Sequence, residues 1–510
     1  MTQANNADTL HIANGSSIGA LRNESGGVID NAYIAVHVDS NSTVQSGFYN
    51  NGSIHGQEAV YFDNATISNG GLLNDINGQI SGDSHGFYLL GSNITGDVVN
   101  HGSIDGSEGA IVLNNNTTLH GGISNTGTLH SDWPGSAAVQ VDSSTVDGNI
   151  ANSGTITALD GAGIAVTGQS TTGVISNAVN SSINGNANGI YLNNSTTGNI
   201  DNSGTITSAN GAGVYLQNNG NANQILNRTG GSITGADYGI ELAQSQTGSI
   251  ENSGTISGAN AAILLSDNST VAGGILNNGT INGTGRGIMV DTSATGAIDN
   301  LSGGTIAVTD YGILVTGTGA TVTGNISNEG HISGSSGIWL ADGATQTGDI
   351  NNSGTIAITH TGNNNNGFSA TAIEIGGVSN QAVTLDGSIN NSGQITSDQA
   401  GIFAVGAATI TGSITNSGSI NAAIAGMGAT SSVVNSVANT ALIQGDVVNT
   451  STGTIQGTGY GIALVQAGVD GNVLNQAPST SARAACGWPG MWAVRRPIAA
   501  ALRLLTAWAC

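Results

Sequence analysis

The stretch from Asn152 to Asn202 reads NSGTITALDGAGIAVTGQSTTGVISNAVNSSINGNANGIYLNNSTTGNIDN and contains the repeating unit of the chain twice. An Asn-Ser-Gly-Thr-Ile turn begins at Asn152, an Ile-x-Asn ends at Asn177, and a second Asn-Ser-Gly-Thr-Ile begins at Asn202, which gives a period of about 25 residues. The same asparagine recurs at Asn23, Asn50, Asn74, Asn100, Asn125, Asn152, Asn177, Asn202, Asn227, Asn252, Asn277, Asn300, Asn328, Asn352, Asn391, Asn416, Asn449 and Asn475. Most of the gaps lie close to this period, so the chain is an array of one unit.

Each unit contains three short apolar pieces separated by Gly, Ser, Asn or Asp, namely Thr155-Ile156, Ile164-Ala165-Val166 and Val174-Ile175. Glycine and β-branched residues form helices poorly, so the pattern predicts three brief strands joined by turns. Four or five inward aliphatic side chains cannot offset the entropy of ordering about 25 residues. The units must therefore stack, which predicts an all-β parallel β-helix (solenoid) of some 18 coils, on the order of 85 Å long.

The recurring Asn-x-Gly step predicts a sharp corner in each coil. Asparagine and glycine both tolerate the left-handed backbone that tight corners use. Stacked asparagine side chains can also hydrogen-bond to one another along the rod. Both arguments assign these asparagines a structural role and no chemistry.

The composition limits the classes of partner. The 510 residues include 81 glycines and only four prolines, yet the apolar residues recur in fixed places, which favours order over disorder. Lysine is absent, and seven arginines face 31 acidic residues, for a net charge of -24. We therefore do not expect nucleic acid or an anionic membrane surface as a partner, because binding phosphate needs clustered Arg and Lys. No apolar stretch reaches the length of about 18 residues that a bilayer-spanning helix needs, so no transmembrane helix is expected.

The repeated Gly-x-Ile-x-Asn-Ser-Gly-Thr-Ile, as in Gly248 to Gly258, followed by Gly-Ile-x-(Leu/Val), as in Gly337 to Leu340, resembles the passenger regions of Gram-negative autotransporters. The resemblance covers residues 10 to 475. It implies a right-handed parallel β-helix of ~25-residue coils, exported by type V secretion through a C-terminal outer-membrane barrel to the cell surface. This sequence shows neither the secretory signal nor the barrel translocator. We therefore expect it to begin inside a larger protein, or its start codon to be assigned too far downstream, and the surface location belongs to the intact protein.

The repeats define one domain over residues 1–475, and a different composition follows over residues 476–510. This tail holds three of the four prolines, three of the five tryptophans, both cysteines and no acid, so the array carries three arginines against 31 acids, a charge of -28. A reading-frame shift in a GC-rich gene would give such an aberrant, poorly ordered tail. The alternative is an amphipathic cap built from Ile498 to Trp508 over the last coil.

One outward position of the middle strand, the third residue of Gly-Ile-x-Leu, is rich in aromatic residues. Along the rod it reads Tyr61, Tyr88, Val112, Gln140, Ala165, Tyr191, Tyr215, Glu241, Leu264, Met289, Leu314, Trp339, Glu374 and Phe403. Aromatic faces on a flat sheet can stack on sugar rings or pack against protein, so the candidate binding residues are Tyr61, Tyr88, Tyr191, Tyr215, Trp339 and Phe403. The alternative is that strand positions favour aromatic residues in any case.

Two repeats are stretched beyond the usual period, one from Asn352 to Asn391 and the other from Asn416 to Asn449. Insertions in solenoids project as loops that often carry function. The run Asn363 to Asn366 favours a flexible loop tip, and Ser131 to Gly135 favours a turn that exposes Trp133.

The sequence gives little support to an enzyme. Asp201 and Glu251 occupy equivalent outward positions two coils apart, roughly 9.6 Å, within loose reach of an inverting carboxylate pair, but other acids are equally scattered. The nine histidines, His11 through His360, lie singly in different repeats without metal spacing. We therefore assign no catalytic, cofactor-binding or metal residues and expect no cofactor.

The expected function is that of a non-enzymatic surface adhesin or self-associating protein, acting in aggregation or biofilm formation through many weak contacts that add by multivalency. The expected partner is a glycan or protein on a host or neighbouring cell, or another copy of the chain. A polysaccharide hydrolase or lyase and a non-functional truncated remnant are the alternatives.

Overall fold

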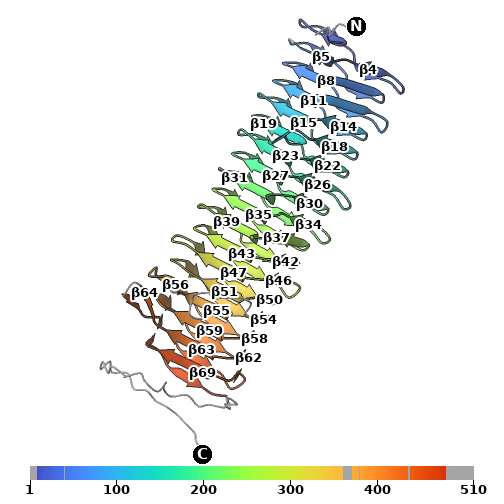
Figure 1. The fold of residues 1–510 in the computed structure, drawn as a ribbon. Helices are drawn as coiled ribbons and strands as arrows, with labels where there is room; N and C mark the ends of the chain where they lie inside the picture. Colours follow the sequence, from blue (N-terminus) through green and yellow to red (C-terminus); the bar gives the residue numbers. More distant parts are fainter. Residues whose placement is uncertain (1–7, 40, 360–369, 378, 435–436, 478–510) are drawn as a thin grey trace, which may run out of the picture.

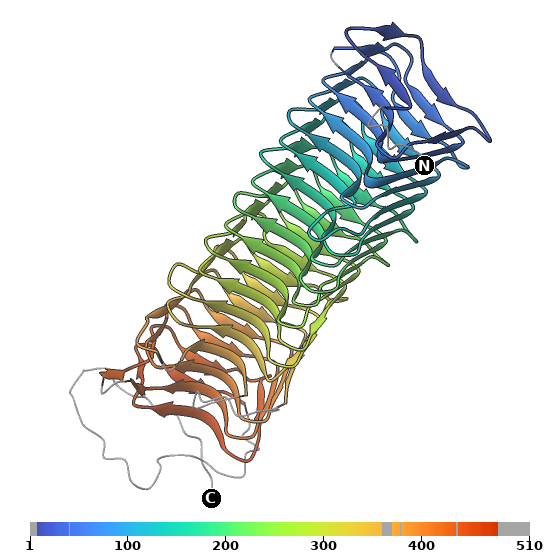
Figure 2. The same ribbon diagram turned by 45° about the horizontal axis from the view of Figure 1, so that its top comes forward.

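The computed structural model describes residues 8–39, 41–359, 370–377, 379–434 and 437–477. All regular secondary structure in these ranges is β-strand, numbered β1 to β71, and the coils stack into a straight rod (Figures 1 and 2). Among the described residues, no helix is long and apolar enough to cross a bilayer. The prediction of an all-β solenoid is confirmed, and equivalent positions recur about 25 residues apart, as at Asn152 and Asn177. The predicted tail, apart from its first two residues, lies outside the described residues.

One coil shows how the unit folds. It contains β21 (Ile150–Asn152), β22 (Thr155–Ala158), β23 (Ala162–Thr167) and β24 (Thr171–Thr172). The next coil begins at β25 (Ile175–Asn177), which pairs with β21 in parallel so that Ile150 faces Ile175 and Asn152 faces Asn177. The coil therefore has four strands where three were predicted. The strand that the sequence analysis missed is β24.

The coils build three parallel sheets. The wide sheet has 33 strands and takes two strands from most coils, of the β22 and β23 types. The ladder sheet has 18 strands of the β21 type, from β3 (Leu21–Asn23) to β71 (Val473–Asn475). The narrow sheet has 18 strands of the β24 type, from β2 (Ser17–Ile18) to β70 (Gly468–Val469). Each sheet runs the length of the rod.

Inward side chains from the three sheets fill one continuous core. Ile156, Ile164, Val166 and Ile175 are each at most 1% exposed, and in-register residues of the same kind follow in the coils above and below. The core cluster extends from Ile12 to Val447. Each buried aliphatic side chain contributes about 1.5–3 kcal/mol, and stacking lets every coil bury both of its edges.

The recurring asparagines form an unbroken hydrogen-bonded ladder inside the rod. Each Nδ2 donates to the Oδ1 of the asparagine in the next coil at 2.7–2.9 Å, through 17 links that join all 18 asparagines from Asn23 to Asn475. Those from Asn23 to Asn449 are at most 7% exposed. The prediction that stacked asparagines bond along the rod is confirmed.

The left-handed backbone lies at a different corner. The asparagines of the ladder end strands and none has a positive φ, so the prediction that they supply the left-handed residues was wrong. Between the wide and narrow sheets, by contrast, most coils place a residue with φ near +50° or above, as at Asn64, Ser143, Gln169, Asn194, Gln244 and Thr292. Asparagine adopts this conformation more easily than most residues. The presence of asparagine in the ladder is therefore explained by the hydrogen bonds of its side-chain amide and not by its backbone conformation.

The two stretched repeats leave the ladder intact. Asn352 bonds to Asn391 and Asn416 bonds to Asn449, both within 2.8 Å, although 39 and 33 residues separate the partners. The second insertion contains β64 (Ser432–Val434) and β65 (Val437–Asn439), which pair in antiparallel fashion at the side of the rod (Figure 1). Asn439 also bonds to Asn380 of the preceding insertion at 2.7 Å. The Asn363 to Asn366 run lies outside the described residues.

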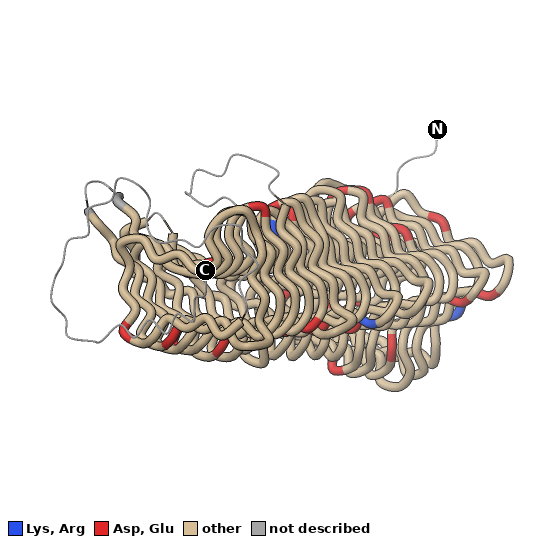
Figure 3. Tube along the Cα trace, turned by 90° about the horizontal axis from the view of Figure 1, so that it is seen from below, with Lys and Arg blue, Asp and Glu red and all other residues tan. Residues whose placement is uncertain are grey.

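Acidic residues are distributed along the rod, whereas basic residues are few (Figure 3). The described residues include only three arginines, Arg22, Arg228 and Arg286. No described face of the rod therefore offers the clustered positive charge that phosphate binding requires.

We predict that breaking the ladder at one rung destabilises the rod. Asn202→Ala removes the acceptor of Asn177 and the donor to Asn227 inside a buried site. Leaving such groups unsatisfied costs about 1–3 kcal/mol each, so the urea midpoint followed by circular dichroism should fall. Asn210→Ala is the control, because the Asn210 side chain makes a single exposed hydrogen bond, to Asn186 of the preceding coil. Equal midpoints for the two variants would contradict the importance of the ladder.

Candidate functional site

One outward position of the β23-type strands in the wide sheet forms a column along the rod, which we call the central column. Strand register places Tyr61 of β8 (Ser53–Asp63) opposite Tyr88 of β11 (Gln79–Leu90), and Tyr191 of β27 (Asn188–Asn193) opposite Tyr215 of β31 (Ala212–Gln217). Further along, the register runs Leu314, Trp339, Glu374 and Phe403. The structure therefore brings all six predicted binding residues onto a single line. Their role in binding stays a prediction.

The first aromatic group of the column extends beyond the predicted residues. His11 of β1 (Leu10–Ile12), His37 of β5 (Ile34–Val38), Tyr61 and Tyr88 stack in order, with ring centroids 4.7, 4.9 and 5.1 Å apart. Coils about 4.8 Å apart place successive rings at stacking distance. The faces of Tyr61 are thus covered by its neighbours, and a sugar ring cannot stack on them.

The other aromatic groups are shorter. Tyr191 lies 5.5 Å from Tyr215 with a tilt of 32°, and its hydroxyl donates to Gln217. Trp339 lies 5.1 Å from Tyr311, and its Nε1 donates to the Gly376 carbonyl at 2.6 Å. All four tyrosine and tryptophan side chains are half-buried. The ring contacts and these hydrogen bonds hold Tyr191 and Trp339 in fixed orientations.

Parts of the central column are closed to solvent. Phe403 is only 1% exposed and packs in a small cluster with Ala400, Val405 and Ala425, separate from the main core. The expectation that Phe403 offers an exposed face was wrong. It does point away from the core, as predicted, but neighbouring side chains cover it. Val112, Ala165, Leu264 and Leu314 are likewise at most 8% exposed.

Two carboxyl groups in the column have strongly raised pKa values. Burial, with smaller contributions from Asp237 and Asp267, raises the pKa of Glu241 to about 7. Burial raises the pKa of Glu374 to about 8, and its Oε1 has no hydrogen-bond partner among the described residues. Both lie beside apolar or aromatic neighbours, Glu241 between Tyr215 and Leu264 and Glu374 between Trp339 and Phe403. A carboxyl group with a pKa of about 7 or 8 is largely or partly protonated at pH 7 and can donate a proton.

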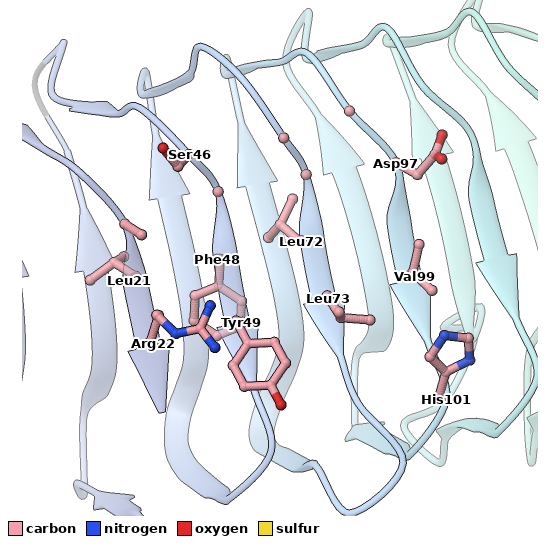
Figure 4. Close-up of a pocket in the computed structure, with 15 residues that line it drawn as sticks. Leu21, Arg22, Ser46, Phe48, Tyr49, Leu72, Leu73, Asp97, Val99 and His101 are labelled. Carbon is pink, nitrogen blue, oxygen red and sulfur yellow. The ribbon is translucent and has the colours of Figure 1, made fainter. Parts of the chain in front are cut away.

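A second surface lies on the outer face of the ladder sheet. A cavity of about 600 Å³ crosses four coils there, and its outward residues include Arg22, Tyr49, Leu73, Val99 and His101 (Figure 4). We call it the ladder-sheet trough. The Arg22 guanidinium lies 4.3 Å from the centroid of the Tyr49 ring. The trough is not visible in the sequence, because its outward residues are of different types and align only through the strand register, namely Arg22, Tyr49, Leu73 and Val99.

The polar groups of the trough are fixed by bonds between coils. The Tyr49 hydroxyl donates to Asp75 at 2.9 Å, and Asp97 accepts the backbone N–H of Gly122 at 2.7 Å. The pKa of Asp75 is lowered by the backbone N–H of Ile76 and then by Tyr49. An apolar floor with a cation, an aromatic ring and carboxylates at its rim is typical of surfaces that bind polar ligands such as glycans.

The acid pair considered from the sequence is already engaged. Asp201 receives two hydrogen bonds from Arg228, at 2.8 and 2.9 Å. Glu251 accepts a hydrogen bond from Ser249 at 3.2 Å. On the outer face of the ladder sheet, Asp201 and Glu251 lie in one column with Leu226 between them. A carboxylate bound to an arginine is a poor general base or nucleophile. This pair therefore offers no acid–base site.

The two smaller predictions on the surface have different outcomes. Trp133 lies in a turn and is 56% exposed, as predicted. The histidines, in contrast, were expected to lie singly, but six of them contact a carboxylate. Residues one coil apart in sequence are neighbours in space, which counting along the chain conceals.

Comparison with protein-family models, with curated proteins and with solved structures gives no match. The resemblance to autotransporter passengers therefore rests on the repeated motif and on the β-solenoid fold.

We predict that the stability of the rod falls as pH rises through the titration range of Glu374. Its folded pKa of about 8 exceeds the ordinary value of 4.5, so folding favours the protonated form. The stabilisation is complete below about pH 4.5 and is lost as pH rises toward 8. Glu374→Gln should make the melting temperature depend less on pH between about 5 and 9. At about pH 9 the melting temperature of the variant should be higher than that of the native chain. Glu329→Gln, at an exposed turn, is the control.

Because the acidic chain also repels itself more as pH rises, the test is the difference between the two variants. Parallel melting curves for Glu374→Gln and Glu329→Gln across this range would refute the assignment.

Proposed function

We propose that the chain is a non-enzymatic surface protein that adheres to cells or to other copies of itself through contacts repeated along the rod. The observation that carries this proposal is the central column. It presents Tyr88, Tyr191, Tyr215 and Trp339 in fixed orientations on one line of a rigid parallel sheet. Weak contacts spaced along a rigid body add by multivalency, because the first contact raises the effective concentration for the next.

The proposal takes its cellular setting from the sequence resemblance. Passenger regions of Gram-negative autotransporters are exported to the cell surface, and the intact protein is proposed to act there. The partner would be a glycan or a protein on a host or neighbouring cell, or a second copy of the chain. The ladder-sheet trough supports a polar partner, because Arg22 and Tyr49 lie beside carboxylates on an open surface.

We predict that the triple change Tyr191→Ser, Tyr215→Ser and Trp339→Ser weakens adhesion without unfolding the rod. The purified chain is coated on microspheres, and clustering of the beads and their attachment to cells are counted. A severalfold loss is expected, with an unchanged β-sheet spectrum. Trp133→Ser is the matched control, because it removes an exposed tryptophan outside the column.

Full adhesion by the triple variant would rule out the central column as the contact surface. An equal loss of adhesion in the Trp133→Ser control would show that exposed aromatic residues promote adhesion non-specifically, without recognition by the central column.

A polysaccharide hydrolase or lyase is the second candidate, and Glu241 is the observation that favours it. Its pKa of about 7 suits a general acid, and it lies in register with Tyr215 on an outward strand position. Under this proposal Glu241 protonates the leaving oxygen of a glycosidic bond, and a nearby carboxylate, Asp237 or Asp267, activates water.

We predict that an enzyme of this kind would release reducing ends from pectin or lipopolysaccharide, and that Glu241→Gln would lower the rate at least a hundredfold. Glu329→Gln should leave the rate unchanged. Absence of reducing ends with the native chain, alongside positive bead clustering, would eliminate this candidate and leave the adhesive function standing.

A further inference from the structure

The histidines of the first coils make contacts that fall into two geometric classes. In the first class, each ring nitrogen that contacts an acid meets a different carboxylate of a neighbouring coil, as for His120 with Asp147 at 2.7 Å and His130 with Asp105 at 3.0 Å. At His55, the two ring nitrogens face different acids, Nδ1 toward Asp30 and Nε2 toward Asp83. In neither arrangement do three ligand atoms converge on one point.

The second class is represented by Asp8, His11 and His37. One ligand atom from each lies within 4.8 Å of the other two, which no other group of three His, Cys, Asp or Glu residues achieves in the described part of the chain. His37 Nδ1 lies 2.8 Å from Asp8 Oδ2, and His11 Nδ1 lies 3.5 Å from the same oxygen. Two imidazole nitrogens therefore approach one carboxylate oxygen.

The solenoid itself creates this convergence. His11 and His37 are one coil apart, and they face each other in the register of β1 and β5. Their rings are parallel to within 1° at 4.7 Å. Stacking of parallel rings on adjacent coils directs both Nδ1 atoms to the same side, where Asp8 lies. The side chains are thus held in place before any ligand arrives.

The second nitrogen of His11 is oriented by another carboxylate. His11 Nε2 lies 2.8 Å from Asp39 Oδ2. With Nε2–H donating to Asp39, the lone pair of Nδ1 is directed toward Asp8. Histidines that bind metals almost always donate their other N–H to a carboxylate, carbonyl or water in this way.

We propose that Asp8, His11 and His37 form a binding site for a divalent transition-metal ion such as Zn²⁺. Two neutral imidazoles and one carboxylate are a donor set that such ions prefer, and three protein ligands leave one position for water. Zinc bonds of about 2.0–2.1 Å place the ligand atoms of a tetrahedral site about 3.3 Å apart. The His37 Nδ1–Asp8 Oδ2 distance of 2.8 Å would therefore widen, and the two stacked rings would tilt toward each other, as the ion binds.

The exposure of the three ligands fits a site that an ion can enter. The His11 side chain is 43% exposed, whereas those of Asp8 and His37 are 10% and 13% exposed. The ion would enter past His11 and be shielded on its inner side. It would also tie the first described coil to the second, since His11 belongs to β1 and His37 to β5. Asp39 would act as a positioning residue.

The test is a titration of the untagged full chain with ZnCl₂, followed by calorimetry. A background of Cys486→Ser and Cys510→Ser removes competing thiol ligands, and a polyhistidine tag is avoided for the same reason. We expect one equivalent of zinc per chain. His37→Ala and Asp8→Asn should each weaken binding at least tenfold, and Asp39→Asn should weaken it about 10- to 100-fold. His120→Ala, which breaks a simple His–Asp pair, is the matched control.

A second readout separates coordination from folding. Co²⁺ bound by two nitrogens and oxygen has visible absorption bands that depend on the ligand set, and these bands should be lost in His37→Ala and kept in His120→Ala. Circular dichroism checks that each variant retains its β-structure. No saturable binding of zinc by the native chain, or equal weakening in His120→Ala and His37→Ala, would overturn the proposal.

Discussion

The buried asparagine ladder is the constraint on which the rest of the structure depends. An amide inside an apolar core must both donate and accept, and here each asparagine satisfies its neighbours above and below, as Asn202 does at 2.9 Å on either side. A slip of one residue in any coil would leave two amides without partners and turn inward side chains outward. The ladder and the alternation of inward aliphatic side chains therefore both fix the register. Insertions are tolerated wherever the ladder closes again, as from Asn352 to Asn391.

Once the register is fixed, the outer surface becomes a set of columns with one residue per coil. Neighbours in a column are about 4.8 Å apart, so their side chains contact each other whatever their type. Aromatic rings then stack, as from His11 to Tyr88, and carboxyls next to apolar groups lose solvent, as at Glu241 and Glu374. The same geometry places Asp8 against His11 and His37. In this fold, the contacts and pKa values of surface residues therefore depend on which residues lie one coil period apart in the sequence.

The sequence predicted the features that follow from the period, and missed those that depend on local surroundings. The stacked coils, the asparagine ladder and the composition of the central column follow from positions one period apart. Strand β24 was missed because Thr171 and Thr172 carry no apolar signal, although Thr172 points inward and bonds to Thr197 at 2.9 Å. The burial of Phe403 was missed because it depends on neighbours outside its column. His11 and His37 were missed because their strands lack the Gly-Ile-x-Leu motif.

The columns also explain how so acidic an array tolerates its own charge. Two unit charges about 4.8 Å apart repel by about 3 kcal/mol at an effective dielectric constant of about 20. In the outer column of the ladder sheet, Asp201, Glu251 and Asp299 are separated by leucines, so the acids are two coils apart, beyond the Debye length of about 8 Å. Across the described strands, no acidic residue is in register with another, and several face histidine instead. The repeat thus places some carboxylates beside apolar neighbours, where burial raises their pKa values, and others beside histidines, with which they form histidine–carboxylate clusters. The alignment of one residue per coil in each column therefore explains two features. It separates the acidic residues, which limits their repulsion, and it brings together the residues of the sites proposed on the surface.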